Sequence, residues 1–199
     1  MTSIELNGVS YWLREHRPVD AVAQALTPLL MLHGFTGSSA AWAELLPRFE
    51  RRALAPDLLG HGQTAAPDAP TRYAMENAAA DLAVLIEQTV AEPVHLLGYS
   101  MGGRLALYFA MTYPDMVTTL TLESASPGLA DPAARAQRRT ADEALAAAIE
   151  ADGISAFVKR WERLPLFAIQ AHLAAPVRAA LRTQRLKNDP VGLANSLRG

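Results

Sequence analysis

The chain has 199 residues, half of them hydrophobic, and a formal net charge of −2. This length suits one domain with a buried core, and the near-neutral charge argues against a nucleic-acid partner. The sequence has no cysteine, which excludes disulfides and thiolate metal sites. It also has neither a membrane-spanning apolar stretch nor a basic and apolar leader after Met1. We therefore expect a cytoplasmic protein without a membrane partner.

The first 130 residues alternate between predicted strands and helices. Strands are expected at 4–6, 10–14, 29–32, 52–55, 94–97 and 117–122, and helices at 40–46, 76–91 and 101–112. Asn7 and Gly8 suit a hairpin turn, and the apolar run at 29–32 indicates a strand buried on both faces. This alternation predicts an α/β fold, with a mostly parallel sheet and helices on both of its faces.

The last third of the sequence differs in character. Residues 131–199 contain no convincing strand and read as short helices separated by Gly153, Pro165, Pro176 and Pro190. A helical block after the sixth strand is most simply a cap over the edge of the sheet. The sequence thus predicts a core at residues 1–130 and a helical cap at 131–199.

The segment Gly98-Tyr99-Ser100-Met101-Gly102 lies between a predicted strand and a predicted helix. This arrangement is typical of a nucleophile elbow, a tight turn that lifts the serine hydroxyl out of the sheet. Ser100 is therefore the candidate nucleophile or proton acceptor. The backbone N–H groups of Met101 and of Phe35, in the loop after an earlier strand, are the candidate oxyanion donors.

A serine hydroxyl needs a base to take its proton. In a fold with this elbow the base follows the last strand, and none of the five histidines stands there. His33 is expected to order the oxyanion loop, and His61 to have a structural role. Glu123 ends the strand 117–122, where it is either a displaced catalytic acid or a residue that holds the following loop.

Arginine dominates the basic residues, with only Lys159 and Lys187 among the 18. Arg104 lies one helical turn after Ser100, so both can project toward one region. The cap carries further sets at helical spacing: Arg135, Arg138 and Arg139, and Arg178, Arg182 and Arg185. In a pocket they would bind a multiply anionic substrate. On solvated helix faces they would have no ligand role, and composition alone favours that second interpretation.

The segments 33–37 and 56–62, together with the elbow and Gly103-Arg104, resemble the α/β-hydrolase superfamily. More specifically, 123–129, 161–167, 192–198 and the arginines between them resemble the 2-succinyl-6-hydroxy-2,4-cyclohexadiene-1-carboxylate synthases of menaquinone (vitamin K2) biosynthesis. These lyases eliminate pyruvate from 2-succinyl-5-enolpyruvyl-6-hydroxy-3-cyclohexene-1-carboxylate. The resemblance runs from about residue 28 to the end of the chain.

The resemblance implies roles for particular residues. Ser100 would take the substrate proton, while Phe35 and Met101 would hold the oxyanion. The positions that would line the pocket are Tyr99, Arg104, Arg138, Trp161 and Arg182. The implied partner is a small substrate with several carboxylates, and neither a cofactor nor a metal is implied.

Members of that family continue past a Ser-Leu-Arg-Gly motif into two more strands, which carry the catalytic Asp and His. The resemblance thus implies that the last strands of the fold are missing here and that this chain alone is a poor or inactive enzyme. An uncovered sheet edge would also favour self-association. Two alternatives stay open: a serine carboxylesterase-type hydrolase, against which the arginine-rich cap argues, and a non-catalytic remnant.

Overall fold

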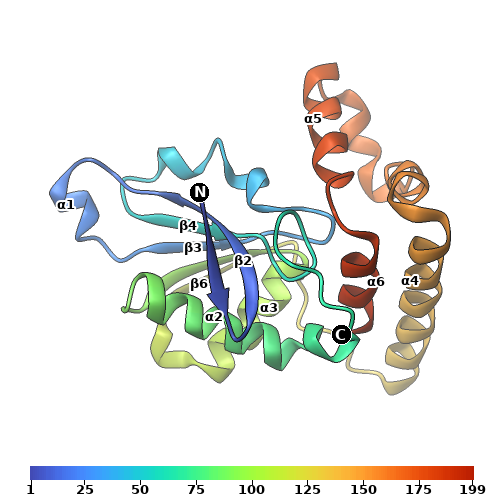
Figure 1. Cartoon of the computed structure of the whole chain (residues 1–199), viewed down its shortest axis with the longest axis horizontal. Helices are drawn as coiled ribbons and strands as arrows, with labels where there is room; N and C mark the ends of the chain where they lie inside the picture. The colour runs from blue at the N-terminus through green and yellow to red at the C-terminus, as the bar shows by residue number, and fades with distance from the viewer.

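A computed structural model describes residues 1–199 and contains one six-stranded sheet (Figure 1). Its strands are β1 (Thr2–Leu6), β2 (Val9–His16), β3 (Leu29–Leu32), β4 (Ala53–Pro56), β5 (Val94–Tyr99) and β6 (Val117–Glu123), in the spatial order β1-β2-β4-β3-β5-β6. Strand β3 pairs in parallel with β4 and β5, and β5 with β6, whereas β2 is antiparallel to β1 and β4. The predicted α/β fold with a mostly parallel sheet is confirmed.

The α-helices are α1 (Ala21–Gln24), α2 (Met75–Thr89), α3 (Met101–Thr112), α4 (Pro132–Trp161), α5 (Ala175–Arg185) and α6 (Pro190–Arg198). The 3₁₀ turns are η1 (Ser39–Trp42), η2 (Leu46–Arg48), η3 (Pro70–Tyr73), η4 (Pro114–Met116) and η5 (Pro165–His172). The predicted helix at 40–46 is wrong, because η1 and η2 occupy that segment. Pro47 lies in the first turn of η2, and the two 3₁₀ turns bury Trp42 and Leu46 against the sheet.

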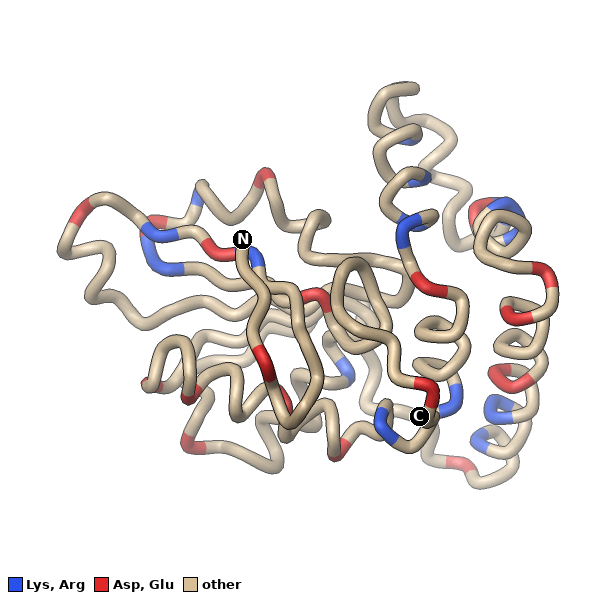
Figure 2. The backbone as a smooth tube through the Cα atoms, viewed as in Figure 1, with Lys and Arg blue, Asp and Glu red and all other residues tan.

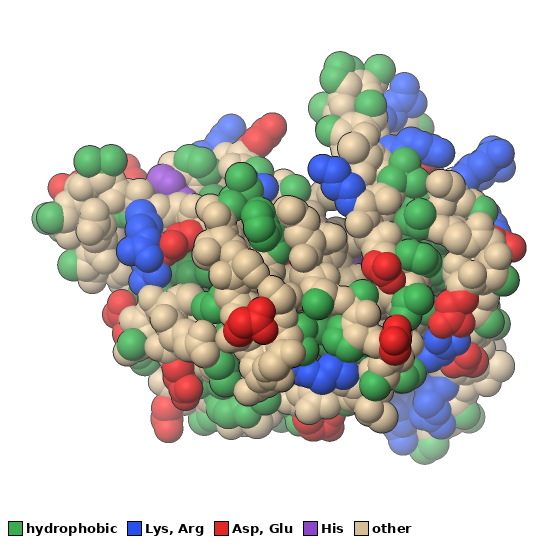
Figure 3. All heavy atoms as spheres, viewed as in Figure 1, with side chains coloured by type: hydrophobic (Ala, Val, Ile, Leu, Met, Phe, Trp, Pro, Cys, Tyr) green, Lys and Arg blue, Asp and Glu red, His purple; other side chains and the backbone are tan.

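Residues 131–199 form helices joined by short turns, without a strand, and lie at one end of the molecule. Helices α4 and α6 lie side by side, and α5 projects away from the body (Figure 1). Figure 2 shows both acidic and basic residues along α4, and Figure 3 shows Lys and Arg side chains gathered around α5. Gly153 interrupts α4 with a φ of 75°. None of the helices is both long and apolar enough to cross a bilayer.

Helix α6 is joined to the core as well as to α4. Gly192 packs directly on Gly60, where an added Cβ would lie 2.4 Å from the Gly60 carbonyl oxygen. Asn195 donates to the carbonyl oxygen of Asp68 at 3.0 Å. At the other end, β6 is an edge strand that pairs only with β5, and most of its side chains are exposed.

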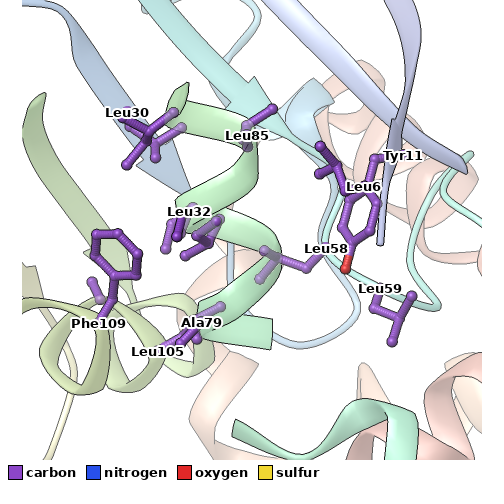
Figure 4. Close-up of a cluster of buried hydrophobic side chains, with 14 of the residues drawn as sticks. Leu6, Tyr11, Leu30, Leu32, Leu58, Leu59, Ala79, Leu85, Leu105 and Phe109 are labelled. Carbon is purple, nitrogen blue, oxygen red and sulfur yellow. The ribbon is translucent and has the colours of Figure 1, made fainter. Parts of the chain in front are cut away.

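The side chains of β3 alternate between two buried clusters, as a strand covered on both faces requires. Leu30 and Leu32 face a cluster built with α2 and α3 (Figure 4). Leu29 and Met31 face the second cluster, which includes Trp42 of η1. The core therefore holds β3 and β5 rigidly, and the loops that follow these two strands form the candidate site.

Candidate active site

Ser100 stands at a strained turn between β5 and α3. Its φ of 53° and ψ of −112° lie outside the regions that L-residues normally occupy. Its N–H donates to the Glu123 carbonyl oxygen at 2.9 Å, and its own carbonyl oxygen accepts the Arg104 N–H at 3.0 Å. The side chain does not cap α3. Strain of this kind persists where the surroundings enforce it, as at a nucleophile elbow, so the predicted turn is present.

Three glycines allow this turn to pack closely. A Cβ on Gly98 would lie 2.4 Å from the Gly102 carbonyl oxygen, and one on Gly102 would lie 2.5 Å from the His33 carbonyl oxygen. A Cβ on Gly103 would lie 2.5 Å from the Cβ of Ala125. Real Cβ atoms do not approach other atoms this closely, so only glycine fits the observed backbone at these positions.

The loop after β3 lies against the elbow. The Gly102 N–H donates to the His33 carbonyl oxygen at 3.1 Å. At Gly34, a Cβ would be 3.2 Å from the Cβ of Ser100. The neighbouring Phe35 N–H donates to no other backbone group. Met101 is the first residue of α3, so its N–H lacks an intrahelical acceptor. Both expected oxyanion donors are thus on segments that touch Ser100, and their role stays a prediction.

His33 orders this loop, as the sequence predicts. Its Nε2 accepts the Leu58 N–H at 2.9 Å, and its Nδ1 lies 2.9 Å from the Gly34 carbonyl oxygen. A carbonyl only accepts, so Nδ1 carries the proton and the ring is neutral. Burial lowers the pKa of His33 to about 4, which agrees with that state. With both nitrogens occupied, His33 is not the base for Ser100.

His61 is buried beside the same loop. Its Nδ1 binds the Leu59 carbonyl oxygen at 3.0 Å, and its ring lies 5.8 Å from that of Phe35. Burial, with His33 nearby, lowers the pKa of His61 to about 3. Its Nε2 is sealed from solvent and has no partner. Neither buried histidine makes a hydrogen bond to Ser100.

The cap contributes an aromatic wall above the loop. The Trp161 ring lies 5.4 Å from the ring of Phe35 and 5.5 Å from that of Phe167. The indole Nε1 of Trp161 is buried without a hydrogen-bond partner, and such donors in native proteins usually meet water or a ligand. Tyr99 is 38% exposed and packs on Gly34. Two of the predicted pocket residues, Tyr99 and Trp161, therefore border the loop that carries Phe35.

None of the three predicted substrate arginines makes a side-chain hydrogen bond to Ser100. Arg138 pairs with Asp142 at 2.6 Å on α4. Arg182 pairs with Glu162 at 2.6 Å, so α5 is tied to the end of α4. Arg104 is exposed on α3. Their function in binding is accordingly a prediction that the contacts neither establish nor contradict.

A hollow between η5 and α5 collects further guanidinium groups. It measures about 620 Å³ and is lined by Arg163, Arg178, Arg182, Arg185 and Glu162, among others. Sequence spacing could not single out Arg185, which is only 8% exposed. It binds Glu162 at 3.2 Å and lies over a phenylalanine ring at 5.1 Å. Four arginines and one glutamate line this hollow, and Glu162 pairs with two of the arginines, Arg182 and Arg185, so the lining carries a net positive charge.

Comparison with known proteins identifies the family. A family model described as the alpha/beta hydrolase fold matches residues 27–179. A Bacillus subtilis (strain 168) protein with the provisional name 2-succinyl-6-hydroxy-2,4-cyclohexadiene-1-carboxylate synthase is 44% identical over 196 residues, covering 97% of this chain and 69% of that protein. The synthase of the same name from Serratia proteamaculans (strain 568) is 32% identical, covering 85% of this chain and 65% of that enzyme.

A solved structure agrees with these matches. The structure of MenH from S. aureus superimposes with a TM-score of 0.85 at 32% identity, covering 94% of this chain and 69% of that one. The chain thus spans about two thirds of the length of these three relatives. It belongs to the α/β-hydrolase fold family and is related, within that family, to the 2-succinyl-6-hydroxy-2,4-cyclohexadiene-1-carboxylate synthases.

Proposed function

We propose that this protein carries the site of a carbon–oxygen lyase that eliminates pyruvate from 2-succinyl-5-enolpyruvyl-6-hydroxy-3-cyclohexene-1-carboxylate. The product is 2-succinyl-6-hydroxy-2,4-cyclohexadiene-1-carboxylate. The observation that supports this most strongly is the strained Ser100 elbow beside the loop that carries Phe35, whose ring packs on Trp161. It occurs in a chain that is 44% identical to a relative named as the synthase of that product.

In this proposal a base first takes the hydroxyl proton of Ser100, and the resulting alkoxide accepts the proton that leaves the ring carbon. The carbon–oxygen bond to the enolpyruvyl group breaks, and pyruvate departs in a 2,5-elimination. Abstraction of that proton places negative charge on a substrate oxygen. The N–H groups of Phe35 and Met101 stabilise this charge because they are already fixed in place. Residues 131–199 form a cap that excludes water from the reaction.

The carboxylates of the substrate give the arginines a role. We assign substrate binding to Arg104, Arg138 and Arg182, with Tyr99 and Trp161 as neighbours of the bound ring. In the structure, Asp142 pairs with Arg138 and Glu162 pairs with Arg182. We propose that substrate carboxylates replace those two acids, an exchange between similar charge-assisted pairs.

The base for Ser100 is a separate question. The ring nitrogens of His33 are both engaged, and His61 is buried and neutral. We therefore propose that Ser100 turns over slowly when neither histidine serves it, because a serine nucleophile without its base typically has a kcat lower by on the order of 10⁴-fold or more. A segment that brings a base to Ser100 would raise the rate.

The test measures pyruvate release from the cyclohexene substrate by two proteins. One is this chain, and the other is this chain joined to the part of the Bacillus subtilis relative that it does not match. The joined protein should release pyruvate at least 100-fold faster than the chain alone. Ser100→Ala should abolish that release, whereas Ser126→Ala, which alters an exposed serine near the same sheet edge, should not.

Two results would overturn the proposal. The first is a folded joined protein that releases no pyruvate under conditions in which the intact Bacillus subtilis relative does. The second is Ser100-dependent hydrolysis of a p-nitrophenyl ester without pyruvate release, which would favour the serine carboxylesterase.

A further inference from the structure

We infer that Asn188, in the segment between α5 and α6, is a positioning residue that fixes the oxyanion loop and so makes the geometry of that loop depend on the cap. Asn188 is 3% exposed. Its Nδ2 donates to the Thr36 carbonyl oxygen at 2.9 Å, across 152 residues of sequence. The assignment of Phe35 as oxyanion donor rests on the proposed function, whereas the contact itself does not.

The residue held by Asn188 is strained. Thr36 has a φ of 66°, a left-handed conformation that is an outlier for a β-branched side chain. Such a conformation is unfavourable and persists only where neighbouring groups determine it. The Gly37 N–H donates to the Gly34 carbonyl oxygen at 2.9 Å, which closes the turn from within. Asn188 is the contact from the cap that holds the same turn from outside.

Thr36 directly follows Phe35, so its carbonyl group and the N–H of Phe35 belong to one tight turn. The Thr36 carbonyl shares its peptide plane with the Gly37 N–H, which donates to the Gly34 carbonyl oxygen. The Gly34 carbonyl in turn shares its plane with the Phe35 N–H, so a rotation that frees Thr36 is passed on to Phe35 through this hydrogen bond. Oxyanion donors act through a fixed direction, and a small displacement weakens them. Asn188 therefore acts on the site through the backbone without touching the reacting atoms.

Asn188 also holds the second loop of the site. Its Oδ1 accepts the Gly62 N–H at 2.9 Å, and its Nδ2 makes another bond, to the Arg185 carbonyl oxygen, at 3.0 Å. One amide thus joins α5 to the loops that carry Phe35 and His61. These partners settle the orientation of the amide, since the reverse would face two acceptors with an oxygen and a donor with an NH₂ group.

The chemistry makes asparagine specific here. An aspartate would still accept the Gly62 N–H but would place a negative oxygen against the Thr36 carbonyl. An alanine would leave one buried donor and two buried acceptors without their partner. Either change should release the turn at residues 33–37.

The experiment measures amide hydrogen exchange across residues 33–37 in this chain and in Asn188→Ala and Asn188→Asp. We expect both variants to accelerate exchange in that segment by at least 10-fold. The matched control is Gln184→Ala, since Gln184 also joins the cap to the core through a 2.8 Å bond to the Ser38 hydroxyl. That control should change exchange in the segment by less than 3-fold.

Unchanged exchange in folded Asn188→Ala and Asn188→Asp, or equal acceleration in Gln184→Ala, overturns the inference. If neither Asn188 variant folds, the unaltered chain still decides, because the Nδ2 protons of Asn188 must then be protected from solvent exchange. Fully exchanging Nδ2 protons contradict the inference. None of these outcomes depends on turnover.

A kinetic arm applies to the joined protein described above. There, Asn188→Asp should lower kcat about 10-fold with KM within 2-fold, since a positioning residue acts on the transition state. An equal change in KM would indicate a role in substrate binding instead. Loss of the proposed lyase activity would remove this arm but leave the exchange result intact.

Discussion

Backbone groups packed against one another form the elbow side of the site, whereas ion pairs between long side chains form the cap side. At the elbow, Gly98, Gly102 and Gly103 leave no space for a methyl group. In the cap, Arg138 and Arg182 are each held by one carboxylate and remain about half exposed. The elbow side is therefore rigid and depends on shape, whereas the cap side is held by ion pairs that remain open to solvent.

The largest expected effect is a loss of stability in acid that originates on the elbow side. His33 and His61 have pKa values of about 4 and about 3 in the folded chain, below the value of about 6.5 expected when unfolded. At a pH between the folded and the unfolded pKa, the unfolded chain binds more protons than the folded chain. The free energy of unfolding therefore falls as pH drops from about 7 toward 4. Each histidine contributes a loss of about 2 kcal/mol between pH 7 and pH 5.

Urea unfolding at pH 7, 6 and 5 measures this slope, that is, how steeply the free energy of unfolding changes with pH. His61→Gln should remove about half of it, because Gln does not titrate in this range. A slope that is the same in His61→Gln and in the unaltered chain would show that the two buried histidines are not its source.

Gly98→Ala should have the second largest effect. We expect it to lower the free energy of unfolding by about 3 kcal/mol, the upper part of the usual range for overpacking. The added Cβ would meet the backbone of the elbow, which cannot move without displacing Ser100. Gly8→Ala is the control: its φ is +79° and nothing lies within 4 Å of the added Cβ. It should cost only about 1–2 kcal/mol, for the left-handed backbone alone. Equal losses in the two variants would contradict the proposed tightness of the elbow.

On the cap side, Glu162→Gln should lower the free energy of unfolding by about 1 kcal/mol, which is of the size expected for hydrogen bonds to charged groups. Arg185 keeps its bond to Gln170 at 2.9 Å, which limits the loss. The change also frees Arg182, so a tricarboxylate probe such as citrate should bind more tightly, as isothermal titration calorimetry would detect. A lower stability with unchanged citrate affinity would mean that Glu162 has no part in anion exchange.

The smallest effect is expected for Asp142→Asn. The pair with Arg138 is an i,i+4 pair on α4 with the arginine 55% exposed, and such pairs contribute below about 0.5 kcal/mol. Thermal unfolding should therefore be almost unchanged. A loss as large as that of Glu162→Gln would show that the two cap arginines are held equally firmly.

The same contrast explains what the sequence could predict. The turn at Ser100 and helix α3 can be predicted from local spacing, because the glycines that this turn requires lie within a few residues of Ser100 in the sequence. The segment 40–46 was predicted as helix and forms 3₁₀ turns, since the burial of Trp42 and Leu46 against the sheet determines its path. No local pattern could pair Arg182 with Glu162 or Asn188 with Thr36, because these partners meet only after folding.

The direct contact of Gly192 on Gly60 has a consequence for how the site opens. Two backbones in van der Waals contact cannot slide apart without breaking the fold locally, and Arg198 ties α4 to α6 through Glu143 and Glu150. Helix α6 and the adjoining part of α4 are thus held rigidly against the core. Any motion of residues 131–199 against the core must then be confined to η5 and the N-terminal part of α5, since Gln184 and Asn188 hold the C-terminal end of α5 to the core.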